Sequence, residues 1–298
     1  MTAPLGLGTY RCRGVAEAAR AALNAGVDWI DTAPNYQGGE AERRLAPVLG
    51  AQPGVRVSTK AGYVSKARRA EAVRAGVLLA EEAERGHSIR PAFVSWQVER
   101  SREELGRTPD IVFLHNPEHG HTTPASLESA LLPAFDALED ACFRGDLGGY
   151  GIATWDAFHK GLTTIGRLLA LARMAGGRHH HLTAVQLPLS LIRITPLVQG
   201  LSGIGVLADA SSAGVDVLAA APLHGGELLD IITPSVAEQL DPGLTPLEAV
   251  LGTVATCPGV TRILLSASTA EHWAGAAAAV ARPVPANCLR RIVDAFSS

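Results

Sequence analysis

Short apolar segments alternate with helical stretches along the chain, and this alternation constrains the fold more than any other feature. Eight segments are predicted to be strands: Leu5–Tyr10, Val27–Thr32, Val55–Lys60, Asp110–His115, Gly149–Ala153, Thr183–Leu187, Val215–Ala221 and Thr261–Ser266. Strands separated by helices run parallel and are joined by right-handed crossovers. Because eight parallel strands close into a barrel, we predict an α/β fold, a single (β/α)8 TIM barrel domain over residues 1–298. The alternative, a doubly wound open sheet, is less favoured because no phosphate-binding glycine loop accompanies the strands.

Capping residues mark several of the helices between these strands. Gly26 ends a predicted helix over Val15–Ala25, and Thr123 followed by proline opens one that runs to about Arg144. Thr245–Glu248 and Ser268–Glu271 both read as capping boxes, and the second predicts a helix over Thr269–Val280. Further helices are expected over Glu40–Leu49, Ala67–Glu84, Pro91–Leu105, Ala157–Ala175 and Gly203–Ala213.

Composition restricts the partners and the compartment. The net charge of −3 argues against nucleic-acid or anionic-membrane partners, and no apolar run reaches the roughly eighteen residues that a membrane span needs. The four cysteines form no C-x-x-C pair and no secretion signal opens the sequence, so we expect a cytoplasmic protein. Three consecutive histidines, His179–His181, cannot all face one ion on an extended segment, so no metal site is expected.

Four polar residues stand at or just past the carboxyl ends of successive predicted strands. Asp31 and Lys60 lie at the ends of the second and third strands, His115 ends the fourth, and Tyr36 follows Asp31 in a loop. A phenol has a pKa of about 10, and a nearby ammonium favours its ionised form. A carboxylate can fix that ammonium, and a histidine can orient a carbonyl oxygen by a hydrogen bond. The set therefore predicts proton transfer to a carbonyl oxygen.

Each of these residues also has a structural explanation when taken alone. Asp31 could cap a turn, Lys60 could lie on the surface, and Tyr36 could pack within its loop. His115 alone would most simply be a hydrogen-bonded residue at a strand end. Their placement on three successive strand ends favours a shared catalytic site, because the loops after the strands carry the chemistry in such barrels.

The same residues resemble the motifs of the aldo-keto reductase family, over nearly the whole chain. The resemblance rests on Gly6–Thr9, on Asp31–Tyr36 with Gly39 and Glu40, on Ser58–Lys60, and on Leu114–Pro117. It implies reduction of an aldehyde or ketone by NADPH. In that reaction Tyr36 would be the general acid, Lys60 would lower its pKa, Asp31 would pair with Lys60, and His115 would orient the carbonyl group.

The resemblance also implies cofactor contacts after the later strands. They would involve Thr154, Gln186, Leu223, Ser266, Ser268 and Glu271, with the helix start near Ser268 holding the phosphate of the adenosine.

Several positions depart from the family pattern. Ala153-Thr154 replaces a Ser-Asn pair that grips the carboxamide, and Ala220 replaces a ring that stacks on the nicotinamide. Ser266 replaces a glycine, Ala276 replaces an asparagine near the adenine, and the usual N-terminal hairpin is lacking. The departures indicate that NADPH is weakly bound or not used.

Three functional hypotheses follow, the first of which is an NADPH-dependent carbonyl reductase acting on a small molecule. The second keeps the Asp-Tyr-Lys-His set but acts as a cofactor-independent lyase, dehydratase or isomerase on a carbonyl compound. The third is a non-catalytic scaffold, which the complete set of four disfavours. Candidate substrate contacts are Tyr10, Tyr63, Trp155 and His224 in the loops after the strands, and they favour a partly apolar ligand.

Overall fold

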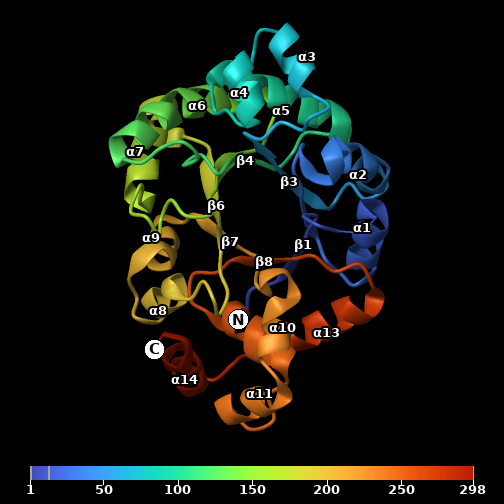
Figure 1. The fold of residues 1–298 in the computed structure, drawn as a ribbon, viewed down its shortest axis with the longest axis vertical. Coiled ribbons are helices and arrows are strands. Elements are labelled where there is room, and N and C mark those ends of the chain that lie inside the picture. The colour runs from blue at the N-terminus through green and yellow to red at the C-terminus, as the bar shows by residue number, and fades with distance from the viewer. Residues whose placement is uncertain (1, 13, 298) are drawn as a thin grey trace.

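Eight parallel strands form a closed barrel in the computed structural model, which describes residues 2–12 and 14–297 (Figure 1). The predicted TIM barrel is confirmed, and each strand pairs with its neighbours in chain order until β8 closes on β1. The strands are β1 Leu5–Gly8, β2 Trp29–Asp31, β3 Arg56–Ala61, β4 Ile111–His115, β5 Tyr150–Ala153, β6 Leu182–Pro188, β7 Asp216–Ala220 and β8 Arg262–Leu265.

Alternation along the strands decides which side chains fill the barrel. Every second residue faces inward, and the inward layer includes the mutually packed cluster of Trp29, Ile111, Phe113, Ala153, Ala184, Leu218 and Leu264. Counting two residues along β2, β4 and β6 from this layer places Asp31, His115 and Gln186 on the inner side, at the carboxyl ends. Lys60 of β3 joins them, because its ammonium donates a hydrogen bond to Asp31. Four of the predicted site residues therefore converge at one mouth of the barrel.

Helices surround the strands, as Figure 1 shows. They are α1 Val15–Asn24, α2 Ala41–Gly50, α3 Arg69–Arg74, α4 Ala80–Arg85, α5 Pro91–Leu105, α6 Pro124–Arg144, α7 Ile165–Gly176, α8 Thr195–Leu201, α9 Gly205–Ala213, α10 Glu227–Ile231, α11 Pro234–Leu240, α12 Thr253–Thr256, α13 Ala270–Ala281 and α14 Ala286–Ser297. Short turns η1 Tyr36–Gly39, η2 Gly177–His179, η3 His224–Gly226 and η4 Glu248–Gly252 complete the elements.

The amino-terminal end of the barrel is filled by a tryptophan and two arginines. Residues 2–4 form no strand ahead of β1. Trp29 at the start of β2 lies under the guanidinium groups of Arg56 and Arg262, whose Cζ atoms are 4.3 and 5.0 Å from the centre of the indole ring system. These cation–π contacts cover the indole at the amino-terminal end of the barrel.

Two predicted helices have different bounds in the structure. The segment Ala67–Glu84 is two short helices, α3 and α4, because the chain turns at Gly76, whose φ of 70° is left-handed. The helix expected from Ala157 begins only at Ile165, where the hydroxyl of Thr164 accepts a hydrogen bond from Arg167 N.

The last capping box is displaced by one residue. Thr269, not Ser268, caps α13 by accepting from His272 N at 3.2 Å. The capping box of Thr245 and Glu248 is confirmed by hydrogen bonds in both directions.

None of the helices in the described part of the chain has both the length and the apolar character needed to cross a membrane.

Candidate active site

A buried ion pair lies at the centre of the barrel mouth. Lys60 and Asp31 are only 2% and 4% exposed, and Lys60 Nζ donates to Asp31 Oδ2 at 2.5 Å and to the carbonyl oxygen of Thr32 at 2.9 Å. Ser58 Oγ donates to the other carboxylate oxygen of Asp31 at 2.8 Å, and Trp29 Nε1 donates to Ser58 Oγ at 3.0 Å. The ammonium therefore has a fixed position at the mouth.

Tyr36 packs against this ammonium from the loop after β2. The chain turns through η1 with Gln37 and Gly38 at φ of 51° and 69°, and this turn sets the half-buried ring over the barrel. Lys60 Nζ lies 5.1 Å from the centre of the Tyr36 ring, and the exposed ring of Tyr10 lies 5.2 Å from it, centre to centre. The predicted Asp-Lys-Tyr arrangement is thus assembled in space.

Electrostatics keep Lys60 charged and Tyr36 neutral. Burial lowers the pKa of Lys60, but the interactions with Asp31 and Tyr36, led by the Asp31 charge, together outweigh it, and the net pKa is raised. Burial raises the pKa of Tyr36, and Lys60 pulls it down without reversing the shift. The sequence predicted the lowering by Lys60 but not that desolvation outweighs it. The phenol consequently holds the proton that a general acid needs.

His115 brings a neutral imidazole to the same mouth. Its ring lies edge-on to Tyr36, with centroids 6.0 Å apart. Burial, the charge of Lys60 and nearby His87 together hold the pKa of His115 well below its usual value. A neutral imidazole carries one N–H, which can donate to a carbonyl oxygen.

An aromatic wall that the sequence did not predict adjoins His115. Tyr63 lies between His115 and His87, with ring centroids 4.8 and 4.6 Å away, and the exposed His119 follows at 6.0 Å. His87 Nε2 is 2.8 Å from the carbonyl oxygen of His115, and burial lowers the pKa of His87 to about 4. His87 is therefore uncharged beside His115 near neutral pH.

Thr154, predicted to bind the cofactor, has its hydroxyl committed to the protein. Thr154 Oγ1 donates to Glu118 Oε1 at 2.8 Å and accepts from Ala157 N at 2.8 Å. A hydroxyl has one proton to donate, so Thr154 has none for a ligand in this arrangement. Glu118 itself was missed, although it stands only three residues after His115 in the sequence His115-Asn-Pro-Glu118.

Of the three predicted cofactor contacts around β8, one is hydrogen-bonded within the protein and two are free in the described part of the chain. Ser266 Oγ lies within hydrogen-bonding distance of two carbonyl oxygens, those of Gly8 at 2.6 Å and Tyr10 at 2.9 Å, and thus binds the loop after β1. Ser268 and Glu271 are exposed, and their side chains form no hydrogen bond within the described residues. They remain accessible at the start of α13, whose twelve residues present a positive helix end.

Gln186 and Leu223 are the remaining predicted cofactor contacts. Gln186 is 5% exposed on the inner side of β6, and its amide makes no hydrogen bond to any residue the structure describes. Leu223 precedes η3 in the loop after β7 and is half-buried, and Ala220 at the end of β7 offers no ring. A free amide that faces the mouth suits a nicotinamide carboxamide, which needs both a donor and an acceptor.

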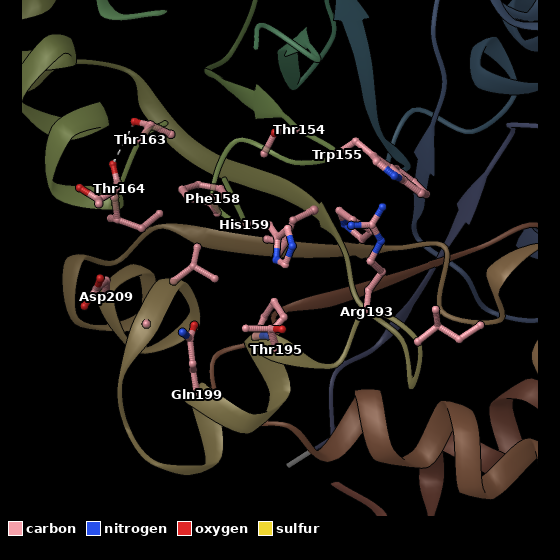
Figure 2. Close-up of a pocket in the computed structure, with 17 residues that line it drawn as sticks. Thr154, Trp155, Phe158, His159, Thr163, Thr164, Arg193, Thr195, Gln199 and Asp209 are labelled. Atoms are coloured by element: carbon pink, nitrogen blue, oxygen red, sulfur yellow. Dashed lines mark hydrogen bonds between the residues drawn. The ribbon is translucent and has the colours of Figure 1, made fainter. Parts of the chain in front are cut away.

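A cavity of about 510 Å³ adjoins the site on the β5 and β6 side. Figure 2 shows it between Thr154, Thr163 and Gln199, with Trp155 and Arg193 at one end. Tyr36, Lys60 and His115 do not line it. Of the predicted catalytic and cofactor-binding residues, Thr154 alone lines it.

The sequence is similar to those of known oxidoreductases. The model of the Aldo/keto reductase family matches residues 4–233. A D-threo-aldose 1-dehydrogenase from a Pseudomonas species is 31% identical over 142 residues, which are 45% of this chain and 42% of that relative. The match thus spans less than half the length of this curated relative.

Solved structures share the fold at low sequence identity. The holo form of an aldo-keto reductase from Bacillus halodurans has a TM-score of 0.70 at 17% identity, over 99% of this chain and 92% of that one. An aldo/keto reductase from Klebsiella pneumoniae, in complex with NADP and acetate, has a TM-score of 0.64 at 21% identity, over 98% and 90%.

Proposed function

The chain belongs to the aldo/keto reductase family, a family of oxidoreductases, and from that premise we propose that it reduces an aldehyde or ketone with NADPH. The observation that carries the proposal is the buried Lys60–Asp31 pair, whose ammonium lies 5.1 Å from the centre of the Tyr36 ring. Burying an ion pair costs desolvation free energy, so this pair is not explained by stability alone. It faces a phenol at the mouth of the barrel, which indicates a role in proton transfer.

The proposed roles follow from the charges. Tyr36 donates its proton to the carbonyl oxygen, and Lys60, held by Asp31, stabilises the phenolate that remains. His115 hydrogen-bonds the same oxygen and orients it. The bound cofactor supplies the hydride that reaches the carbonyl carbon.

The residues present fit the cofactor in part. The unbonded Gln186 amide suits the carboxamide, and the start of α13 beside Ser268 suits a phosphate. Glu271 lies in the first turn of that helix, and Leu223 lies in the loop after β7. Thr154 and Ser266 contribute no free proton in this arrangement, and Ala220 contributes no stacking surface. The Klebsiella pneumoniae enzyme, which shares the fold and was solved in complex with NADP, supports the choice of a nicotinamide cofactor. We therefore propose measurable but weak NADPH binding.

A second candidate function is favoured because the hydroxyl groups of Thr154 and Ser266 already form hydrogen bonds within the protein. A cofactor-independent lyase, dehydratase or isomerase would use the same acid without the contacts at Thr154, Ala220 and Ser266. Either reaction would act on a small carbonyl compound.

Calorimetry with Tyr36→Phe separates these candidates. We expect wild type and Tyr36→Phe to bind NADPH alike, while turnover falls about 10²- to 10⁴-fold in the variant. Absence of NADPH and NADH binding at millimolar concentration would overturn the reductase and leave the elimination or isomerisation. Near-normal turnover in Tyr36→Phe would remove Tyr36 from both mechanisms.

A further inference from the structure

We propose that Glu118 is a positioning residue for the rim after β5, and that it presents the Trp155 indole as a stacking surface for a flat ring of the bound ligand. The ring would be either the nicotinamide or an aromatic carbonyl substrate, so this inference deepens the proposed function and rests on it. The shared chemistry is a planar conjugated ring.

One carboxylate oxygen organises three successive residues of this rim. Glu118 Oε1 accepts from Thr154 Oγ1 at 2.8 Å, from Trp155 N at 2.9 Å and from Asp156 N at 3.0 Å. Two backbone amides and a hydroxyl on one acceptor oxygen fix both the backbone and the direction of the side chain between them. The loop after β4 thereby sets the conformation of the loop after β5.

The other oxygen of Glu118 argues that stability alone does not explain this acid. Glu118 Oε2 is buried and has no hydrogen-bond partner within the described residues. A buried acceptor without a partner is destabilising. The carboxylate is therefore better explained by the rim it holds than by its contribution to folding.

A second contact fixes the Trp155 ring from the loop after β6. The guanidinium Cζ of Arg193 lies 5.3 Å from the centre of the Trp155 ring system, and Arg193 Nη1 donates to Asp156 Oδ1 at 3.0 Å. Figure 2 shows Trp155 directed away from Thr163 and Thr164, with the guanidinium of Arg193 beside it. Three loops of the catalytic face thus hold one indole.

Trp155 remains open to a ligand despite these contacts. It is 41% exposed, whereas Trp29 and Trp273 are buried. It stands two residues after Ala153, whose partner across the sheet is His115. An aromatic face at this position can replace the stacking that Ala220 cannot provide.

The test compares ligands with and without the ring. Dissociation constants of NADPH and of 2′,5′-ADP, which lacks the nicotinamide, are measured by calorimetry for Trp155→Ala, Trp155→Phe, Glu118→Ala and Glu118→Gln. If the ring is the nicotinamide, Trp155→Ala and Glu118→Ala weaken NADPH about 2- to 13-fold and leave 2′,5′-ADP unchanged. Trp155→Phe and Glu118→Gln keep a ring and an acceptor oxygen, respectively, and should restore most of the affinity. Glu128→Gln, which removes an acid paired with Arg167, is the matched control.

Substrate kinetics distinguish the other source of the ring. If the ring belongs to the substrate, NADPH affinity stays constant and Trp155→Ala raises KM for benzaldehyde but not for propanal. Unchanged NADPH affinity together with an unchanged ratio of the two KM values would overturn the stacking role.

Acrylamide quenching of the ligand-free protein tests Glu118 apart from the cofactor. Glu118→Ala should increase quenching of the Trp155 emission, with the Trp155→Phe protein giving the signal of the other tryptophans. Equal quenching in Glu118→Ala and wild type would overturn the positioning role. If wild type binds no NADPH, the proposed reductase fails while this measurement still decides the role of Glu118.

Discussion

Lys60 is the positive charge of the candidate site, and it lies beside the proposed acid Tyr36. The pKa of Lys60 is raised because Asp31 and Tyr36 together outweigh burial, while the net pKa of Tyr36 is raised by burial despite Lys60. The ammonium therefore stays charged as the phenol stays neutral. This combination suits an acid that must give up a proton beside a fixed positive charge.

Removing Lys60 and removing Asp31 should shift the pH dependence in opposite directions. Lys60 lowers the pKa of Tyr36 and Asp31 raises it, so Lys60→Met extends the alkaline limb of residual activity upward and Asp31→Asn moves it downward. Lys60→Met also leaves a buried carboxylate unpaired, at a cost of about 3–5 kcal/mol in the free energy of unfolding. Rate measurements against pH, with thermal melts as the folding control, check this. Identical alkaline limbs in the two variants would show that Tyr36 is tuned by other groups.

The sequence predicts the charged residues of the site better than the hydroxyl groups around it. Asp31, Lys60 and His115 each lie near the carboxyl end of a strand, at a position whose side chain points into the barrel. The alternation of side chains along the strands is therefore enough to bring them together. Thr154 and Ser266 depend on partners that only the closed barrel supplies. Glu118 precedes Thr154 by 36 residues, and Gly8 precedes Ser266 by 258. No local pattern indicates where such hydroxyl protons go.

At the scale of elements, α2 is joined to β3 through a buried acid. Glu42 on α2 accepts a hydrogen bond from Thr59 Oγ1 on β3, while its second oxygen is buried without a partner among the described residues. Burial raises the pKa of Glu42 to about 7, against the hydrogen bond from Thr59, which lowers it. The fold therefore favours the protonated form of this carboxyl.

Glu42→Gln should stabilise the protein at alkaline pH. The folded pKa exceeds the unfolded value of 4.5, so the stabilising preference is complete below about pH 4.5 and is lost as pH rises to about 7. The shift corresponds to about 3 kcal/mol in the free energy of unfolding. Urea unfolding of both proteins at acidic and alkaline pH checks this. A difference between them that does not grow with pH would contradict the buried-acid account.

Gly151 permits the close approach of β5 to β6. A Cβ atom added there would lie 1.8 Å from the carbonyl oxygen of Ala184. Gly151→Ala should therefore lower the free energy of unfolding by more than the roughly 1–3 kcal/mol typical of overpacking. Gly166→Ala is the control, because its Cβ would meet only Thr164 Oγ1 at 3.9 Å within α7 and should stabilise by up to about 1 kcal/mol. Similar denaturation midpoints for the two variants would refute the close contact.

The strands and long helices could be predicted because their patterns are local, whereas the short helices could not. Pro91 and Leu105 bound α5 as expected, and Thr123 caps α6. Helices α8, α10, α11 and α14 were not predicted. The last three belong to a separate apolar cluster with η4, so their stability depends on packing between segments distant in sequence.

For the whole molecule, we propose that residues 1–298 form one domain. The main core extends from Ala3 to Val293 and includes residues of all eight strands, among them Val217 of β7 and Ile263 of β8. Figure 1 shows α10, α11 and α14 gathered beside the same barrel. We expect a single cooperative unfolding transition, with tryptophan fluorescence and far-ultraviolet circular dichroism giving one midpoint. Two separated transitions would show that the cluster around α14 unfolds independently.

The central claim is that Tyr36 protonates a carbonyl group as a nicotinamide cofactor reduces it. The most direct measurement is a single turnover of excess protein with NADPH, deuterated at the transferred position, and an aromatic aldehyde, followed by the absorbance of the reduced nicotinamide. We predict that wild type consumes NADPH with a primary isotope effect and that Tyr36→Phe loses about 10²- to 10⁴-fold in rate. Conversion of a carbonyl compound by wild type without any consumption of NADPH would contradict the claim.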